Sequence, residues 1–108
     1  MPGAAIIVLT TVPDREAAES LARTLLAGRL AACVNVGASV ESMYHWRGQI
    51  ETAREVPVVI KTQALLYSRV EELILATHPY ELPEVVAVPI THGLAQYLDW
   101  IAGETQVP

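Results

Sequence analysis

The sequence is poor in cysteine and in positive charge, and each shortage excludes a class of protein. Cys33 is the only cysteine among 108 residues, so the chain cannot close an internal disulfide or build a zinc site from paired cysteines. A buried, inert thiol is its expected state. Seven lysines and arginines stand against twelve acidic residues, for a formal net charge of -5, and they are scattered. A nucleic-acid partner is therefore not expected.

Long apolar runs and targeting signals are also missing. No apolar stretch approaches the ~18 residues that a membrane span requires. The first ten residues, MPGAAIIVLT, lack the basic flank and the cleavage pattern of a secretory signal. Glycine-rich phosphate-binding loops of the two common types are absent as well. These absences predict a cytoplasmic protein without a membrane partner.

Apolar residues, by contrast, are abundant. They make up 52% of the chain without counting glycine, whereas soluble domains contain roughly 45–50% even when glycine is included. The length suits one domain over residues 1–108. A single copy of that size would leave much apolar surface in water, so the composition favours an oligomer.

Hydrophobic periodicity predicts four strands and three helices along the chain. The expected strands cover residues 4–12, 30–46 (with a loop at 37–39), 50–62 and 83–90, and the expected helices cover residues 14–28, 63–78 and 94–101. The valine-rich part of the last strand is expected in the core. The first six elements form the ferredoxin-like split βαβ arrangement of the α+β class, with a C-terminal helix added.

A few residues predict how these elements begin, end and turn. Thr11 or Asp14 can cap the first helix, and Gly28 is expected to end it in a left-handed conformation. Gly48 allows a tight hairpin turn. Pro57 lacks a backbone N–H, so it belongs at a sheet edge or a bulge.

The hairpin of the second and third strands is longer than a small domain needs. Strands typically run ~5–6 residues, so the outer part of this hairpin is expected to extend past the core. Its unpaired edges would be available to another subunit.

Six stretches of the chain occur together, in the same order, in one known family. They are TTVPD at residues 10–14, RLAACVNV at 29–36, SMYHWRGQI at 42–50, EVPVVIKT at 55–62, HPYELPEVVAVPITHG at 78–93 and YLDWI at 97–101. The chain thereby resembles the CutA (CutA1) divalent-cation tolerance proteins. The resemblance implies a homotrimer held by pairing of the long hairpins, with an architecture similar to the PII proteins. It also implies a link to copper tolerance and a binding or structural module without catalysis.

Candidate metal ligands are few. Copper favours imidazole and thiolate ligands, which are supplied here by His45, His78, His92 and Cys33. Relatives with a proposed copper site resemble this chain except at Thr10, where they carry cysteine, and at Thr77, where they carry histidine. The resemblance therefore implies at most weak binding of Cu²⁺ or another divalent cation, with His78 as a candidate ligand and no required cofactor. The alternative role of His78 is a C-terminal helix cap whose imidazolium complements the helix dipole, and His45 is expected at the solvated surface.

Candidate ligand-contacting residues lie near strand ends and in the loop before the last strand, where a trimer of this fold has clefts between subunits. They are Cys33, Asn35, Tyr44, Trp46, Glu55, Lys61, His78, Tyr80, Glu81 and Glu84. Aromatic walls with a few polar groups are typical of a small-molecule pocket. Alternatively, Tyr44 and Trp46 bury the subunit interface. Lys61 can equally form an interface ion pair with Glu55 or Glu84.

Two other functions remain open at this point. One is a PII-like signalling module that binds a small anion or metabolite at subunit clefts. The other is a small trimeric enzyme in which His78 and Glu81 or Glu84 act as acid and base.

Overall fold

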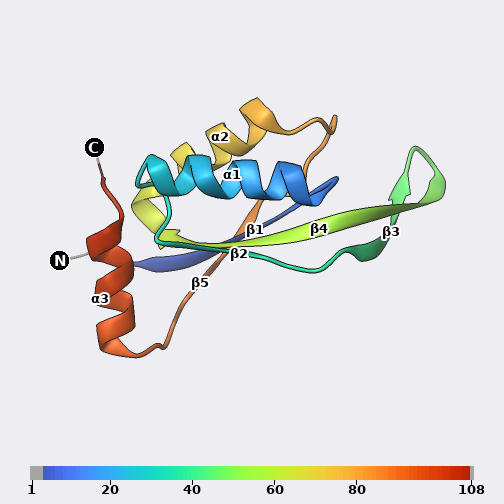
Figure 1. The fold of residues 1–108 in the computed structure, drawn as a ribbon. Coiled ribbons are helices and arrows are strands. Elements are labelled where there is room, and N and C mark those ends of the chain that lie inside the picture. The colour runs from blue at the N-terminus through green and yellow to red at the C-terminus, as the bar shows by residue number, and fades with distance from the viewer. Residues whose placement is uncertain (1–3, 108) are drawn as a thin grey trace.

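The computed structural model describes residues 4–107, which form a five-stranded antiparallel sheet with two helices on one face (Figure 1). The elements are β1 (Ala5–Val12), α1 (Arg15–Ala27), β2 (Cys33–Val36), β3 (Val40–Trp46), β4 (Gln49–Gln63), the short 3-10 helix η1 (Ala64–Leu66), α2 (Tyr67–Thr77), β5 (Val86–Pro89) and α3 (Ala95–Glu104). The sheet order is β2-β4-β1-β5, and β3 also pairs with β4. This arrangement confirms the predicted ferredoxin-like split βαβ fold of the α+β class.

The core lies between the sheet and the two helices α1 and α2. Side chains of β1 alternate strictly between half-buried and buried, as a strand with one covered face requires. Val8 and Ile60 from the sheet, Leu25 from α1 and Ile74 from α2 have no measurable exposure and belong to one hydrophobic cluster. The two faces of the sheet are therefore unequal, and the helices cover only one of them.

The opposite face of the sheet, called here the open face, is only partly covered. Ile7 of β1 pairs with Val88 of β5, and Leu9 pairs with Val86, so all four side chains lie on this face. Val86 and Val88 are exposed. The expectation of a buried strand over residues 83–90 is wrong for this chain, because β5 has four residues and pairs only with β1 at the sheet edge.

Pro57 of β4 lies opposite the point at which the second expected strand is interrupted. Residues 37–39 face residues 56–57 between the end of the β2 ladder and the start of the β3 ladder. The Gly37 N–H donates to the Pro57 carbonyl at 2.9 Å, and a Cβ on Gly37 would lie 2.8 Å from the Pro57 ring. This extra residue confirms the predicted bulge and divides the expected strand over residues 30–46 into β2 and β3.

The first helix ends at Gly28 as expected, with Gly28 as its C-cap residue, but the left-handed residue comes one position later. Gly28 has an ordinary φ of -83°, while Arg29 has the left-handed φ of 58°. The Arg29 N–H donates to the Leu26 carbonyl at 3.1 Å and the Leu30 N–H to the Leu25 carbonyl at 3.0 Å. This is a Schellman motif with arginine in the left-handed position, so the expected left-handed Gly28 is wrong.

The start of α1 is determined by a local cap, whereas the start of α2 is determined by the length of strand β4. Asp14 caps α1 by accepting from the Ala17 N–H at 2.8 Å, which confirms one of the two predicted caps. The second helix begins later than expected, because β4 continues through Gln63 and η1 intervenes before α2. No helix within residues 4–107 is long and apolar enough to cross a membrane.

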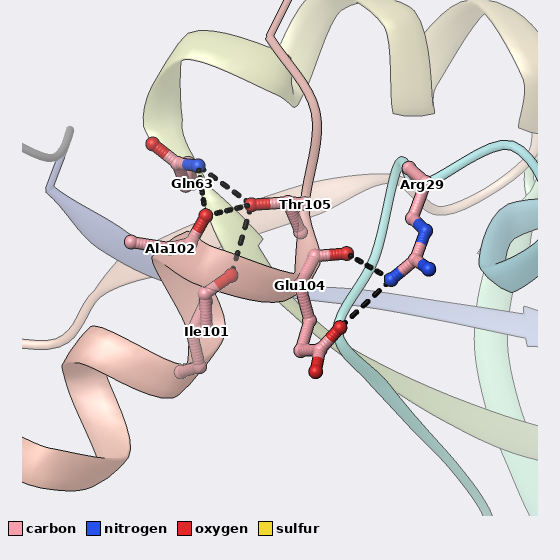
Figure 2. Close-up of polar contacts among 6 residues, drawn as sticks. All are labelled: Arg29, Gln63, Ile101, Ala102, Glu104 and Thr105. Carbon is pink, nitrogen blue, oxygen red and sulfur yellow. Dashed lines mark hydrogen bonds and ion pairs between the residues drawn. The ribbon is translucent and has the colours of Figure 1, made fainter.

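Polar contacts attach the C-terminal end of α3 to the sheet and to the end of α1 (Figure 2). The Gln63 side-chain amide donates to Thr105 Oγ1 at 2.6 Å and to the Ala102 carbonyl at 3.3 Å. Arg29 Nη1 forms an ion pair with Glu104 Oε2 at 2.7 Å. These donors satisfy carbonyls that the end of a helix leaves free, and they hold α3 over one end of the open face.

Candidate functional site

An open cleft of about 620 Å³ lies between the β3–β4 hairpin and the loop that precedes β5. Small-molecule sites typically measure roughly 300–1,000 Å³. The lining residues come from β1, from both strands of the hairpin and from the loop, and they are Thr11, Ser42, Met43, Tyr44, His45, Trp46, Ala53, Glu55, Tyr80, Glu81, Leu82 and Glu84. The cleft is thus built by residues far apart in the sequence.

The hairpin supplies the aromatic wall. Ser42, Tyr44 and Trp46 lie on one face of β3 because side chains alternate along a strand. Arg47 and Gly48 have φ values of 50° and 79°, as the type I′ turn of a two-residue hairpin requires. The hairpin extends away from the helices, as predicted (Figure 1).

Glu55 is the most buried acidic group of the cleft. Glu55 is 8% exposed. Its Oε2 accepts a hydrogen bond from the Thr11 hydroxyl at 3.0 Å. No basic side chain within residues 4–107 lies within ion-pair distance of it. Lys61 does not pair with Glu55 within the chain; its Nζ lies 5.9 Å from the centre of the Tyr97 ring.

His78 ties the loop to the end of β1. Its backbone N–H donates to the Ile74 carbonyl at 2.9 Å and ends α2. Its ring Nδ1 accepts from the Tyr80 N–H at 3.2 Å, so Nε2 carries the proton that reaches the Thr11 carbonyl at 2.6 Å. The structure confirms that His78 ends the helix. Both ring nitrogens are directed to Tyr80 and Thr11 rather than to the free carbonyls at the end of α2.

The rest of the loop is positioned by Tyr80 and Glu81. The Tyr80 ring lies 4.6 Å from the His78 ring, centre to centre. Burial raises the pKa of the Tyr80 phenol, and the Glu55 carboxylate raises it further, so the phenol stays neutral. Arg47 Nη2 lies 2.8 Å from Glu81 Oε2 and joins the loop to the hairpin turn.

The structure brings six of the ten predicted site residues together in this cleft. They are Tyr44, Trp46, Glu55, Tyr80, Glu81 and Glu84. His78 lies behind the cleft, where it contacts Thr11 and Tyr80. Cys33, Asn35 and Lys61 lie elsewhere, because β2 pairs with the inner half of β4 on the other side of the bulge.

Cys33 differs from its expected environment. The residue is only half-buried, and its Sγ lies 3.9 Å from Asn35 Oδ1 on the open face. Among the residues that sequence reasoning missed, Thr11 is the most informative. In the alternating pattern of β1, Thr11 occupies a position whose side chain points away from the core, and this alternation could have identified it from the sequence.

The donors around the candidate metal position do not form a metal site. Within residues 4–107, no group of three histidine, cysteine, aspartate or glutamate side chains is placed to hold an ion. Thr10 is buried in the core, and its hydroxyl has no hydrogen-bond partner there. His45 is exposed, as expected, and His92 is exposed too. These residues do not fit a tightly bound copper ion.

The fold and the cleft define a ferredoxin-like α+β protein with an elongated hairpin. The chain matches the family of the CutA1 divalent ion tolerance protein over residues 6–104, and it belongs to that family. It is 40% identical over 99 residues to the divalent-cation tolerance protein CutA of Thermus thermophilus, covering 92% of this chain and 96% of that protein.

Other relatives extend the comparison. The chloroplastic protein CutA of Arabidopsis thaliana is 42% identical over 101 residues, which cover 94% of this chain and 56% of the plant protein. The chain thus spans little more than half of that relative. The crystal structure of CutA1 from Oryza sativa superposes with a TM-score of 0.93 at 39% identity, covering 97% of this chain and 96% of that one. The structure of a periplasmic CutA from Archaeoglobus fulgidus superposes with a TM-score of 0.91 at 36% identity, over 94% and 99%.

Proposed function

We propose that the protein acts in divalent-cation tolerance as a cytoplasmic homotrimer and as a binding or structural module without catalysis. The names of the relatives support the link to divalent cations. Cys33, the one thiol, contacts Asn35 rather than a base, which supports a function other than nucleophilic catalysis.

Exposed apolar side chains on the hairpin and the open face carry the proposal of a trimer. Ile50 near the hairpin turn is 70% exposed, and Val86 and Val88 on β5 are exposed as well. The outer edges of β3 and β5 have no strand partner within residues 4–107. Apolar surface of this kind, next to unpaired strand edges, is typical of a subunit interface.

Charges placed on these surfaces should dissociate the trimer. Light scattering on the wild type should give three times the 11.7 kDa of one chain, whereas Ile50→Glu combined with Val88→Glu should give a mass near that of one chain. The matched control is Leu65→Glu combined with Leu75→Glu, two equally exposed positions outside the sheet, and it should remain trimeric. A wild type that is monomeric at micromolar concentration would refute the trimer.

Weak binding of a divalent cation is the second part of the proposal. A cation at His78 Nδ1 must displace the Tyr80 N–H, so affinity for Cu²⁺ should be low. In calorimetric titrations, His78→Ala should bind Cu²⁺ about tenfold more weakly than the wild type, a loss of about 1.4 kcal/mol. His92→Ala, the exposed control, should match the wild type. Equal affinities in all three proteins would remove His78 from any metal role.

The cleft does not favour the PII-like alternative of a bound anion. Glu55, Glu81 and Glu84 line it, and His45 is the one basic residue of the lining. Like charges would repel an anion from such a site.

A further inference from the structure

Glu55 is a buried carboxylate that receives only neutral donors from its own chain. The Thr11 hydroxyl donates to its Oε2 at 3.0 Å, and the Tyr80 phenol is hydrogen-bonded to it as well. Glu84, a second lining residue, takes part in none of the ion pairs within residues 4–107. Hydroxyl groups reduce the cost of burying a carboxylate but supply no positive charge. A cation for this cleft must therefore come from outside the chain that builds it.

The positions of the basic residues leave one of them for such a pairing. Three lie on the helices, on the covered side of the sheet, and these are Arg15, Arg23 and Arg69. Arg29 and Arg47 already form ion pairs with carboxylates of their own chain. Arg54 points to the face of the hairpin opposite Glu55, because neighbouring side chains alternate along β4. Lys61 is the one basic residue that remains.

Lys61 lies on the open face without an acidic partner. It pairs with Ile7 of β1 and with Cys33 of β2, so these side chains lie beside it on that face. Its Nζ lies 5.9 Å from the centre of the Tyr97 ring, and none of the ion pairs within residues 4–107 includes it. Lys61 thus carries the charge that the cleft lacks, and the cleft carries the charge that Lys61 lacks.

Glu55 and Lys61 cannot meet within one chain. Both point away from the core, because they alternate with the buried residues Val56, Val58 and Ile60 along β4. A strand rises ~3.3 Å per residue, so six positions separate the two by about 20 Å. Complementary groups at two places on one surface can pair between copies arranged head to tail, and such an arrangement closes into a ring.

We propose that Lys61 of the partner subunit enters this cleft and pairs with Glu55, with Glu84 as a second carboxylate beside it. Tyr44 and Trp46, which line the cleft, would cover the aliphatic stem of the lysine. A ring of three copies contains three identical pairs, and each cleft is completed by two chains. The inference rests on the homotrimer proposed above and adds which groups meet at its interface.

A double-mutant cycle tests this contact between chains. Light scattering at a fixed urea concentration gives the chain concentration at which half of the trimer has dissociated. Lys61→Met and Glu55→Gln remove the charges and nearly keep the lengths, so each should raise this concentration at least about tenfold. The double variant should raise it about as much as either single change, rather than by the product of the two. Residues about 20 Å apart in one chain show no such coupling.

The controls separate this inference from the trimer itself. Arg23→Met, at an exposed position of α1 on the covered side of the sheet, should have no effect alone or combined with Glu55→Gln. A trimeric wild type in which the effects of Lys61→Met and Glu55→Gln multiply would overturn this inference alone. A monomeric wild type would overturn both the trimer and the inference.

Chemical cross-linking provides a second measurement if circular dichroism shows that Glu55→Gln does not fold. Lys61 is the only lysine of the chain, and a carbodiimide joins an amine to a carboxylate that it contacts. In trimers assembled from isotopically labelled and unlabelled chains, mass spectrometry should find Lys61 joined to Glu55 or Glu84 of a differently labelled chain. Lys61→Arg should abolish this product. A trimer in which Lys61 is joined to other carboxylates, or to none, would overturn the inference.

Discussion

Ile60→Ala should lower the free energy of unfolding by about 4 kcal/mol. Ile60 lies at the centre of β4, where it faces Val8 of β1 on one side and Val34 of β2 on the other. It has no measurable exposure and belongs to the core cluster between the sheet and the helices. Truncation removes buried methyl and methylene groups and leaves a cavity that neighbours on a sheet fill poorly.

Urea unfolding followed by circular dichroism measures this effect. Because any oligomer makes the result depend on concentration, all proteins are compared at one protomer concentration. Leu75→Ala on the exposed side of α2 is the matched control and should cost less than about 1 kcal/mol. Equal losses for the two variants would show that the core does not lie where the structure places it.

Ile101→Ala should detach α3 and lower the free energy of unfolding by about 3 kcal/mol. Ile101 is the one buried residue of this helix. The polar contacts of Gln63, Arg29 and Glu104 act at the C-terminal end of α3 only (Figure 2). Without the apolar anchor, the rest of the helix has little to hold it on the open face.

Hydrogen exchange distinguishes detachment from general unfolding. Amides of residues 95–104 should lose protection in Ile101→Ala, while those of β1 and β4 keep theirs. Leu94→Ala, at a position 71% exposed before the helix, should leave exchange unchanged. Uniform loss of protection across the sheet would show that α3 is an integral part of the core instead.

These two sites divide the molecule into a packed half and a partly covered half. Ile60 represents the face that α1 and α2 cover, which a single chain completes by itself. Ile101 represents the open face, where one short helix covers one end and Val86 and Val88 remain exposed. The cleft continues from this second half along the hairpin. The apolar surface that the chain leaves uncovered therefore lies on this second half.

Periodicity along the chain was sufficient to predict most elements of the fold. Gly48 was predicted to allow a tight hairpin turn, and the structure confirms a two-residue turn there. Asp14 as a cap and Pro57 at a bulge are confirmed as well. Each of these features depends on residues within a few positions of one another, which is the range over which propensity and pattern act.

Predictions from local sequence patterns were wrong where the structure depends on contacts with residues distant in the sequence. The left-handed residue is Arg29 rather than Gly28, because the tertiary path into β2 determines where the chain must turn. Residues 83–90 read as a buried strand, yet β5 lies at the edge of the sheet and is exposed. An apolar run looks the same in sequence whether or not another element covers it.

By itself, the sequence determined the α+β class, the order of the elements and which residue types could build a site. Only the tertiary structure decided that His78 reaches the Thr11 carbonyl across 67 positions of the chain and that Arg47 reaches Glu81 across 34. It also decided that Glu55 is buried without a cation beside it. The physical reason is that the hydrophobic periodicities of strands and helices reflect contacts between residues that are close in the sequence. The meeting of a loop with a hairpin depends on how the whole sheet twists and packs.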